Sequence, residues 1–574
     1  MIFRFAEERG NTMQLNGSEI LIECLLEQGV DTVFGYPGGT VLNIYDALYK
    51  NSHRIQHVLT AHEQGASHAA DGYSRATGKV GVCIATSGPG ATNLVTGIAT
   101  AYMDSIPMVA ITGNVAVPLL GRDSFQEIDI TGVTIPITKH NFLVKDVNDL
   151  ADTVRLAFEI AQSGRPGPVL VDIPKDVSAA VTEYIPAPSS KARPINPPKP
   201  ERMERTLEIL KEAKRPLIYM GGGVIAAGAY QQLRAQAEKL DIPVCSSLMG
   251  LGAFPADHPL WLGMVGMHGT RAANIATRDC DALLVCGARF SDRVAGNPKG
   301  FAPNAKIIHM DVDHAEFDKN VQVTVRLAGE LKEVLFGLAS RLETTKHPEW
   351  IDACTANKVD WPSYPADPEG PVDPSVILRT LRDLTDRDTV LATDVGQHQM
   401  WSAQFYKQFE PRRLLTSGGL GTMGYGMGAA IGAQFGKQDS KVVLVTGDGC
   451  FHMNLNELTT MVSYKLPVVI LVMNNRVLGM VRQWQKVFYQ KRFSATDPER
   501  QTDYVKLAEA FGAKGLTIAK NGDIEPVLRE ALATTDGPVV VDCRISKDCN
   551  VLPMIPPGGS VENMIESMEA YEHE

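Results

Sequence analysis

The sequence lacks the patterns that mark several large classes of protein. Its nine cysteines occur singly, with no CxxC pair, so neither a zinc site nor a redox dithiol is indicated. No apolar run approaches the roughly 18 residues of a membrane span, and the first ten residues contain no signal-peptide core. Met13 is a candidate start, because the first periodic helical pattern begins at Leu15. We therefore expect a cytoplasmic protein with reduced thiols and no membrane partner.

Strong charge of one sign is also absent. The chain has 55 Lys and Arg against 66 Asp and Glu, a net charge of -11 over 574 residues, with no block of Lys and Arg. A nucleic-acid or anionic-membrane footprint would need such a block, so nucleic acid is not an expected partner. A chain of this length is expected to hold about three to four domains.

Two proline-dense stretches divide the chain, at residues 185–200 and 361–374. Stretches of this composition are typical of extended linkers between domains. In the blocks around them, Val- and Ile-rich runs alternate with helical patterns, which indicates parallel sheets. We predict three doubly wound α/β domains, over residues 14–184, 200–345 and 372–555.

Residues 442–449 and 467–475 are the most informative segments. Both are apolar runs suited to buried parallel strands, and the residues between them repeat their apolar side chains at helical spacing. Asp448 and Asn475 then follow neighbouring strands at the carboxyl edge, where open α/β sheets bind ligands. One carboxylate and one amide oxygen are about the number of protein ligands that Mg²⁺ uses beside cofactor phosphates.

Asp448 lies in a GDG motif and Asn475 in an NN motif, 27 positions later (475 minus 448). These two motifs at this spacing are the pattern of thiamine diphosphate enzymes. A bare GDG turn would more often be structural. Earlier in the chain, residues 86–93 form a plausible anion cradle at a strand-to-helix turn. Glu63 opens a helix, where taken singly it is explained by the helix dipole.

Together these segments resemble the acetohydroxyacid synthases, also called acetolactate synthases, from about residue 14 to 565. The further matching segments are residues 123–127, 164–175, 266–270, 288–293, 417–426 and 478–484. The resemblance implies an enzyme of branched-chain amino-acid biosynthesis that uses thiamine diphosphate, Mg²⁺ and FAD. It implies that pyruvate is decarboxylated and its two-carbon unit joined to a second pyruvate or to 2-ketobutyrate.

The resemblance also implies roles for individual residues. Those in catalysis are Glu63, Gln126 and Lys175. Those around thiamine diphosphate are Glu63, Gln397, His398, Gly421, Met423, Gly449 and Met480. The implied magnesium ligands are Asp448, Asn475 and the backbone carbonyl of Val477, and the substrate residues are Phe125, Arg293 and Trp484. On sequence alone, Trp484 is better explained as a core aromatic and Lys175 as a solvated loop charge, and a core methionine is the default explanation for Met423.

The middle block is implied to bind FAD in a structural rather than a redox role. The implied contacts are Arg165, Gly222, Gly223, His268, Gly269, Thr270, Arg289, Asp311 and Asp313. This block carries no GxGxxG fingerprint, so the expectation rests on the resemblance. Two positions depart from the family pattern: Ser291 replaces the first aspartate of FDDR, and Cys450 follows GDG where a serine or alanine is common.

The resemblance further implies a homodimer or homotetramer, because the family places the cofactor between the N-terminal domain of one subunit and the C-terminal domain of the other. A small regulatory subunit is a further expected partner. Four alternatives remain at this point: a pyruvate oxidase, a glyoxylate carboligase, a catabolic synthase without FAD, and an inactive homologue that binds thiamine without turnover. Glu63, Arg293 and the segment at residues 482–484 favour the synthase over the oxidase and the carboligase, and Glu63, Asp448 and Asn475 argue against an inactive homologue. Measured flavin content would separate the catabolic type.

Overall fold

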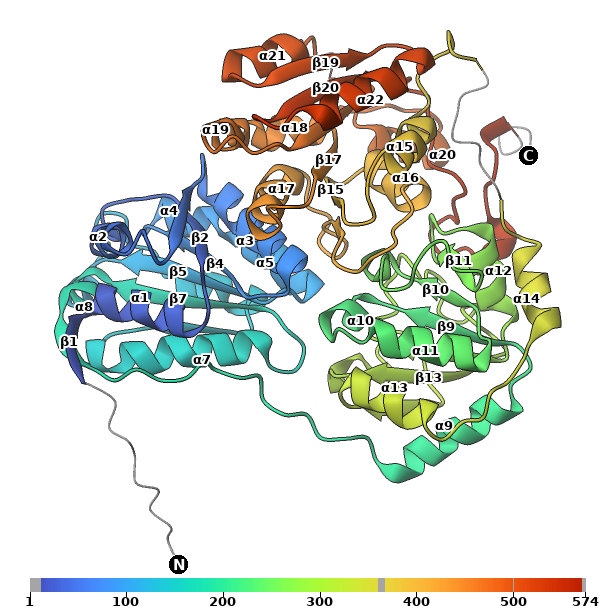
Figure 1. Cartoon of the computed structure of the whole chain (residues 1–574), viewed down its shortest axis with the longest axis horizontal. Coiled ribbons are helices and arrows are strands. Elements are labelled where there is room, and N and C mark those ends of the chain that lie inside the picture. Colours follow the sequence, from blue (N-terminus) through green and yellow to red (C-terminus); the bar gives the residue numbers. More distant parts are fainter. Residues whose placement is uncertain (1–11, 360–366, 499, 570–574) are drawn as a thin grey trace, which may run out of the picture. The chain divides into compact units, whose positions relative to one another are not determined.

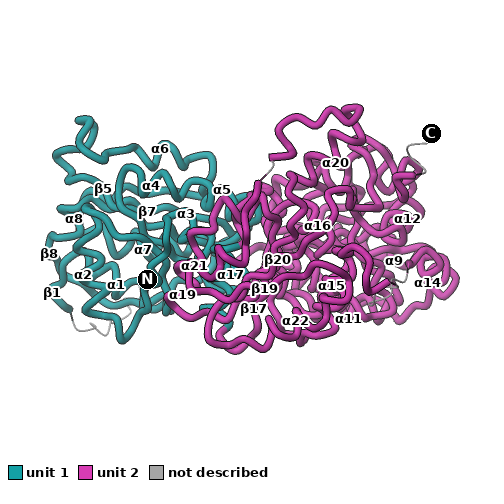
Figure 2. The backbone as a smooth tube through the Cα atoms, turned by 90° about the horizontal axis from the view of Figure 1, so that it is seen from above, with its two compact units in different colours: residues 1–193, 427–437 teal, residues 194–426, 438–574 magenta. Residues whose placement is uncertain are grey.

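Strands and helices alternate along the whole chain in the computed structural model (Figure 1), which describes residues 12–359, 367–498 and 500–569. Two compact units divide it (Figure 2). Unit 1 comprises the chain up to residue 193 together with residues 427–437, and unit 2 comprises the remainder. Each of the three large sheets is parallel throughout, which confirms the predicted α/β class.

Unit 1 is built on a six-stranded sheet with the order β3-β2-β4-β5-β7-β6. Its strands are β2 (Thr32–Gly35), β3 (Gln56–Leu59), β4 (Gly81–Ala85), β5 (Met108–Asn114), β6 (His140–Leu143) and β7 (Pro168–Pro174). Its helices are α1 (Gly17–Glu27), α2 (Leu42–Lys50), α3 (Glu63–Thr77), α4 (Pro89–Asn93), α5 (Val95–Asp104), α6 (Ile130–Thr134), α7 (Leu150–Gln162) and α8 (Lys175–Ala179). A separate antiparallel pair joins β1 (Met13–Asn16) to β8 (Val181–Tyr184). Helices α1, α2 and α7 share one apolar core with the sheet, and α3 packs with α5 and with strands β2 and β4.

Helix α17 (Tyr425–Gly436) adds a late segment of the chain to unit 1 from residue 427 onward (Figure 2). Small residues allow its backbone to approach α3 closely. A Cβ added at Gly428 would lie 2.6 Å from His68 Cβ, and one at Gly432 would collide with the carbonyl oxygen of Ala69. Ordinary side chains at these two positions would therefore separate the helices.

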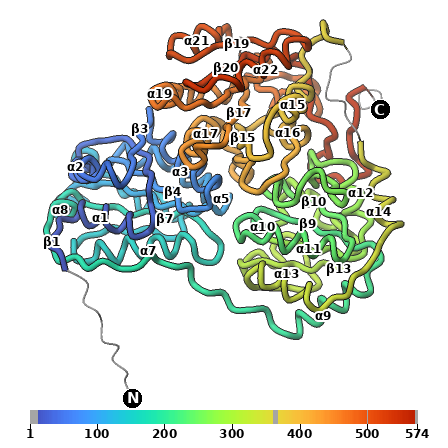
Figure 3. Tube along the Cα trace, in the orientation of Figure 1, coloured from blue at the N-terminus to red at the C-terminus, as the bar shows by residue number. Residues whose placement is uncertain are grey.

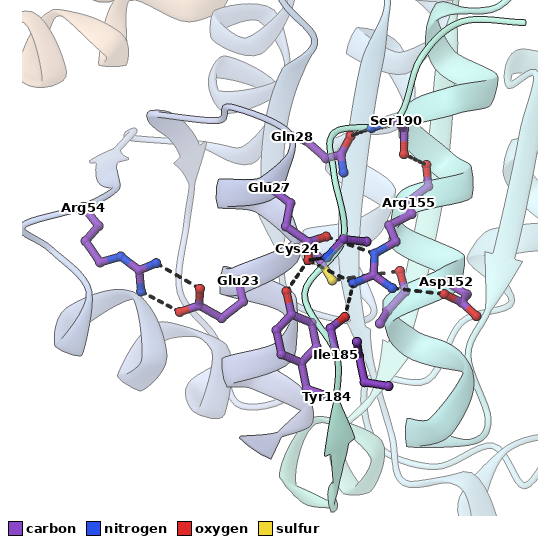
Figure 4. Close-up of polar contacts among 12 residues, drawn as sticks. Glu23, Cys24, Glu27, Gln28, Arg54, Asp152, Arg155, Tyr184, Ile185 and Ser190 are labelled. Atoms are coloured by element: carbon purple, nitrogen blue, oxygen red, sulfur yellow. Dashed lines mark hydrogen bonds and ion pairs between the residues drawn. The ribbon is translucent and has the colours of Figure 1, made fainter. Parts of the chain in front are cut away.

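The first predicted linker begins against helix α1 (Figure 4). Arg155 donates to both carboxylate oxygens of Glu27 at 2.9 Å, and the Tyr184 hydroxyl and the Ala187 backbone N–H donate to the same carboxylate. Burial alone would raise the pKa of Glu27, but these hydrogen bonds outweigh it and lower the pKa below its usual value. Residues 185–199 contain no helix or strand, as the prolines predict.

Unit 2 contains the middle and C-terminal sheets, which Figure 3 traces in green and then in gold to red. The middle sheet has the order β11-β10-β9-β12-β13-β14. Its strands are β9 (Pro216–Met220), β10 (Val244–Ser246), β11 (Trp261–Met264), β12 (Ala282–Cys286), β13 (Lys306–Asp311) and β14 (Val325–Ala328). Its helices are α9 (Pro200–Glu212), α10 (Gly222–Ala226), α11 (Tyr230–Leu240), α12 (Arg271–Asp279), α13 (Leu331–Ala339) and α14 (Pro348–Thr355).

The C-terminal sheet has the order β16-β15-β17-β18-β20-β19. Its strands are β15 (Val390–Thr393), β16 (Leu414–Leu415), β17 (Val442–Gly447), β18 (Val469–Asn474), β19 (Lys514–Ile518) and β20 (Val539–Arg544). Its helices are α15 (Pro374–Asp383), α16 (Gln397–Phe405), α18 (Asp448–Asn454), α19 (Leu458–Ser463), α20 (Gly479–Phe488), α21 (Tyr504–Phe511) and α22 (Ile524–Ala533). The second predicted linker lies partly outside the described residues, which resume at 367. Within the described ranges, no helix is both long enough and apolar enough to cross a membrane.

Candidate active site

Asp448 and Asn475 follow two strands that pair directly in the C-terminal sheet. Strands β17 and β18 run parallel with Gly447 opposite Met473, and both strands are buried along their whole length. Asp448 is the first residue of α18, and Asn475 is the first residue after β18. The two side chains therefore start from the same carboxyl edge, as the spacing of the two segments predicts.

Burial shapes the chemistry of Asp448. Only 2% of the residue is exposed, and burial raises the pKa of its carboxyl to about 6, against the opposing effect of nearby backbone N–H groups. A cation beside this carboxylate would relieve the cost of the buried negative charge. Asn475 supplies an amide oxygen, which also accepts the Val477 N–H at 3.1 Å. These oxygen ligands fit a hard cation such as Mg²⁺.

Other residues predicted to surround thiamine diphosphate lie at the same edge of this sheet. Helix α16 begins at Gln397, and a Cβ added at Gly447 would lie 2.9 Å from the ring of His398. The Nε2 atom of His398 is buried without a hydrogen-bond partner among the described residues, and burial lowers the pKa of this histidine to about 3. A buried neutral imidazole with an open nitrogen suits a site that a polar ligand completes.

Gly449 and Met423 lie near each other beside Asp448. A Cβ added at Gly449 would lie 2.7 Å from Leu478 Cδ2, which it would crowd, and 3.7 Å from Met423 Cε, an ordinary contact distance. Gly421 adopts a φ of 73°, which favours glycine. Met480 lies further along, in α20, and packs against the apolar core of the C-terminal sheet.

Glu63 belongs to unit 1, where it opens α3 and is 8% exposed. The Asn93 side chain donates to its carboxylate at 3.0 Å, and a Cβ added at Gly90 would lie 3.2 Å from the same carboxylate. The turn that the sequence suggested as an anion cradle thus also holds Glu63. The sequence did not reveal this pairing, because the two segments are recognised separately and only the fold brings them together.

The remaining predicted residues of unit 1 differ in their surroundings. Gln126 has a φ of 60° and lies against Gly88, since a Cβ added at that glycine would lie 2.9 Å from the Gln126 carbonyl oxygen. Phe125 is 88% exposed, and Lys175 is an exposed residue at the start of α8. Arg165 donates from Nε to the Ser105 hydroxyl at 2.7 Å.

Arg293 and Trp484 contact each other in unit 2, although the sequence predicted them as separate substrate residues. The Arg293 guanidinium lies 5.5 Å from the centre of the Trp484 ring, a cation–π geometry. Phe488 packs against the same indole in a T-shaped contact, with ring centres 5.3 Å apart. Arg293 also borders a cavity of about 280 Å³, which Asn274 of α12 and Glu562 of the C-terminal segment line as well.

The predicted FAD residues follow the strands of the middle sheet. Gly221 and Gly223 have a structural role, because a Cβ at either position would collide with the backbone of Gly287. The Nδ1 atom of His268 and the hydroxyl of Ser246 are buried without hydrogen-bond partners among the described residues. Ser246 ends β10 and was not singled out in the sequence, and burial lowers the pKa of His268 to about 4. Two unsatisfied polar groups near this sheet fit a polar ligand.

The other members of this set are held by local hydrogen bonds. Thr270 caps α12 by accepting the Ala273 N–H, and Asp311 accepts the backbone N–H of Asp313 at 2.8 Å. Arg289 is half-buried after β12. Gly269 packs closely, because a Cβ there would collide with the carbonyl oxygen of Met264. Gly222 is less crowded, with Met249 Cβ at 3.2 Å from an added Cβ.

Three family models match successive parts of the chain. They are described as thiamine pyrophosphate enzyme N-terminal TPP binding domain, over residues 15–133, central domain, over 203–338, and C-terminal TPP binding domain, over 394–543.

Curated relatives match almost the whole chain. A probable acetolactate synthase large subunit of Methanocaldococcus jannaschii is 47% identical, covering 96% of this chain and 95% of its own. The acetolactate synthase large subunit of Corynebacterium glutamicum is 47% identical over 95% of this chain and 89% of its own. The acetolactate synthase isozyme 2 large subunit of Escherichia coli is 46% identical over 96% of this chain and 100% of its own.

Proposed function

This chain belongs to the acetolactate synthase large subunits among the thiamine pyrophosphate enzymes, and we propose that it joins two pyruvate molecules into 2-acetolactate with release of carbon dioxide. With 2-ketobutyrate as the acceptor, the product is 2-aceto-2-hydroxybutyrate. The observation that carries this proposal is the placement of Asp448 and Asn475 at adjacent strand ends in a chain 46–47% identical to such subunits.

Asp448 and Asn475, with the carbonyl of Val477, would hold Mg²⁺ and through it the diphosphate of the cofactor. The raised pKa and burial of Asp448 support this assignment, because a bound cation stabilises the ionised carboxylate. Bound thiamine diphosphate supplies the electron sink for decarboxylation. Gln397, His398, Gly421, Met423, Gly449 and Met480 would surround it.

Glu63 would hold a proton in a hydrogen bond to the pyrimidine ring of the cofactor. Its burial and its hydrogen bond from Asn93 support this role, because both fix the carboxyl in one orientation. Gln126 and Lys175 complete the proposed catalytic set.

Acceptor selection would depend on Arg293, Trp484 and Phe125. A guanidinium binds a 2-keto acid through its carboxylate, with two parallel hydrogen bonds where geometry allows. The indole of Trp484 orients the guanidinium by cation–π contact and provides an apolar wall for the alkyl group of the acceptor.

The middle sheet would hold FAD in a structural role. His268 and Ser246 support this because their buried unsatisfied atoms would gain partners. The contacts proposed from the resemblance are Arg165, Gly222, Gly223, Gly269, Thr270, Arg289, Asp311 and Asp313. Measured flavin content per chain would test the assignment independently of activity.

A second copy of the chain and a small regulatory subunit are the proposed partners. In unit 1, the segment around α6 exposes apolar side chains that a subunit interface would cover, with Phe125 88% and Ile135 67% exposed. The curated relatives are named large subunits, which supports a small-subunit partner.

Product analysis tests the reaction. The purified chain is incubated with pyruvate, thiamine diphosphate, magnesium and FAD, under nitrogen and in air, with 2-ketobutyrate in a parallel tube. We expect oxygen-independent acetolactate, and acetohydroxybutyrate in the parallel tube. Acetate or acetyl phosphate with oxygen uptake would instead identify an oxidase.

Glu63→Gln provides the matched variant for this assay. The substitution keeps the shape of the side chain and removes its acid, so we expect turnover to fall at least 100-fold, the usual order for loss of a proton-transfer group. Thiamine diphosphate binding, followed by calorimetry, should persist. Undiminished turnover would refute the role of Glu63.

A further inference from the structure

We propose that Gln483 is a positioning residue that orients the amide of Asn475, one of the two side chains proposed to bind magnesium, through the side chain of Gln397. Gln483 and Gln397 are 3% and 4% exposed and lie on different helices, α20 and α16. This inference rests on the proposed magnesium site and adds the means by which the chain orients one of its ligands.

The orientation of the Gln483 amide is set by one backbone residue. Its Oε1 accepts the N–H of Val551 at 2.9 Å, and its Nε2 donates to the carbonyl oxygen of the same residue at 3.0 Å. A backbone donor and acceptor cannot exchange places, whereas a side-chain amide can rotate by 180°. Val551 therefore allows Gln483 only one of its two amide orientations.

This orientation passes to Gln397. The Nε2 of Gln397 donates to Gln483 Oε1 at 3.0 Å and to the carbonyl oxygen of Cys549 at 2.9 Å. Both acceptors lie on the nitrogen side, so the Oε1 of Gln397 is directed to Asn475, whose Nδ2 donates to it at 3.3 Å. Val551 thus orients Gln483, Gln483 and the Cys549 carbonyl together orient Gln397, and Gln397 accepts from the nitrogen of Asn475.

The consequence for Asn475 is a fixed direction of its oxygen. Its Nδ2 donates to Gln397 and its Oδ1 accepts the Val477 N–H at 3.1 Å, so these two bonds together set the direction of the oxygen. Oxygen and not nitrogen is the ligand atom that Mg²⁺ requires. Reversal of the three amides would present the –NH₂ group of Asn475 to the cation.

Gly479 shows how tightly this chain of amides is packed. A Cβ added at Gly479 would collide with Gln397 Oε1 and would lie 2.6 Å from Asn475 Nδ2. Gly479 is the first residue of α20, the helix that also carries Gln483. The start of this helix thus lies directly against the amide pair, and only a glycine at residue 479 leaves room for it.

The test is the substitution Gln483→Glu, which keeps the size of the side chain and replaces the Nε2 donor by an acceptor. The new carboxylate oxygen would face the Val551 carbonyl, which repels it, so the side chain loses one of its two bonds to Val551 and the acceptor that it offers to Gln397 is displaced. We expect the dissociation constant for Mg²⁺, measured by calorimetry at saturating thiamine diphosphate, to rise about 10- to 100-fold, as for other partners of metal ligands. At saturating magnesium, kcat should recover to within about threefold, because the proposed catalytic groups themselves are unchanged.

Gln485→Glu is the matched control. It makes the same chemical change two residues along the same helix, where the amide bonds the Ser494 carbonyl and the Thr496 hydroxyl instead. Its magnesium affinity should equal that of the wild type. Gln483→Met, which is neutral and similar in length, repeats the test should Gln483→Glu fail to fold.

The outcomes separate this inference from the proposed function. An unchanged magnesium affinity in the folded Gln483 variants, or an equal loss in Gln485→Glu, would overturn the positioning role. A fall in kcat that excess magnesium does not restore would also overturn it. Failure of the wild type to bind Mg²⁺ would instead overturn the proposed metal site itself.

Discussion

The contact between Arg293 and Trp484 gives the acceptor pocket its most direct test at the scale of single residues. Trp484→Leu removes both the apolar wall and the cation–π partner of Arg293. We expect the preference for 2-ketobutyrate over pyruvate to fall by about 1–3 kcal/mol, a factor of roughly 5 to 160, while acetolactate formation from pyruvate alone falls less. Competition between the two acceptors in one tube measures this ratio.

Phe488→Leu serves as the control for this experiment. Phe488 makes a T-shaped contact with the same indole, and its substitution leaves the contact between Arg293 and Trp484 in place. Its acceptor ratio should remain close to the wild-type value. If the preference for 2-ketobutyrate fell equally in the two variants, Trp484 would have only a packing role.

Single residues also show where sequence reasoning is sufficient and where it ends. Asp448 and Asn475 were predicted to share a sheet edge because each ends a strong local strand pattern, and parallel topology then fixes their side. Asn93 and Gln483 carry no such signal. Their partners, Glu63 and the backbone of Val551, lie in separate segments, so only the folded chain reveals them.

At the scale of secondary-structure elements, the contact between α1, α7 and the first linker is a stability device (Figure 4). Glu27→Ala would leave Arg155 without its main partner and remove the acceptor of Tyr184 and Ala187. We expect the free energy of unfolding of unit 1 to fall by about 2–4 kcal/mol, as when one partner of a largely buried ion pair is lost. Urea denaturation followed by circular dichroism measures the change.

Glu23→Ala is the control, because Glu23 pairs with Arg54 at the surface, where an ion pair contributes less than about 1 kcal/mol.

The effect of Glu27→Ala on the free energy of unfolding should also depend on pH. The pKa of Glu27 is lowered in the folded chain, so its contribution is complete above the unfolded pKa of about 4.3 and is lost as the pH falls through the folded value. If the loss of unfolding free energy in Glu27→Ala stayed constant down to pH 3, this explanation would be wrong.

Elements differ in how far the sequence predicts them. Buried strands such as β17 and β18 were predicted because short runs of the β-branched residues Val and Ile favour strands that are covered on both faces. Helix α17 is different, because its Gly- and Ala-rich sequence does not reveal which surface it packs against. The predicted boundaries of the three domains follow the linkers, and such boundaries cannot show that residues 427–437 pack with unit 1.

At the scale of the whole molecule, the proposed dimer predicts complementation between two inactive chains. If each active site combines Glu63 of one subunit with Asp448 of the other, a mixed dimer of Glu63→Gln and Asp448→Asn chains contains one intact site. After subunit exchange of an equal mixture, half of the dimers are mixed, and activity should return to about a quarter of the wild-type value.

Each variant alone, carried through the same exchange procedure, is the control and should stay inactive. An absence of recovery, with subunit exchange confirmed by differently tagged chains, would place both residues of each site in the same subunit. The result bears on assembly without depending on the roles proposed for any other residue.

The packing of α17 on α3 also has a consequence for how the chain is made. Unit 1 cannot be completed when residue 193 leaves the ribosome, because α17, the helix that packs against His68 and Ala69 of α3, is encoded after most of unit 2. At synthesis rates of about 5–20 residues per second, the nascent chain waits on the order of ten seconds or more for that helix. During this time the uncovered surface of α3 is available to chaperones and to neighbouring nascent chains, so the order of translation leaves the N-terminal unit unfinished until its last helix emerges.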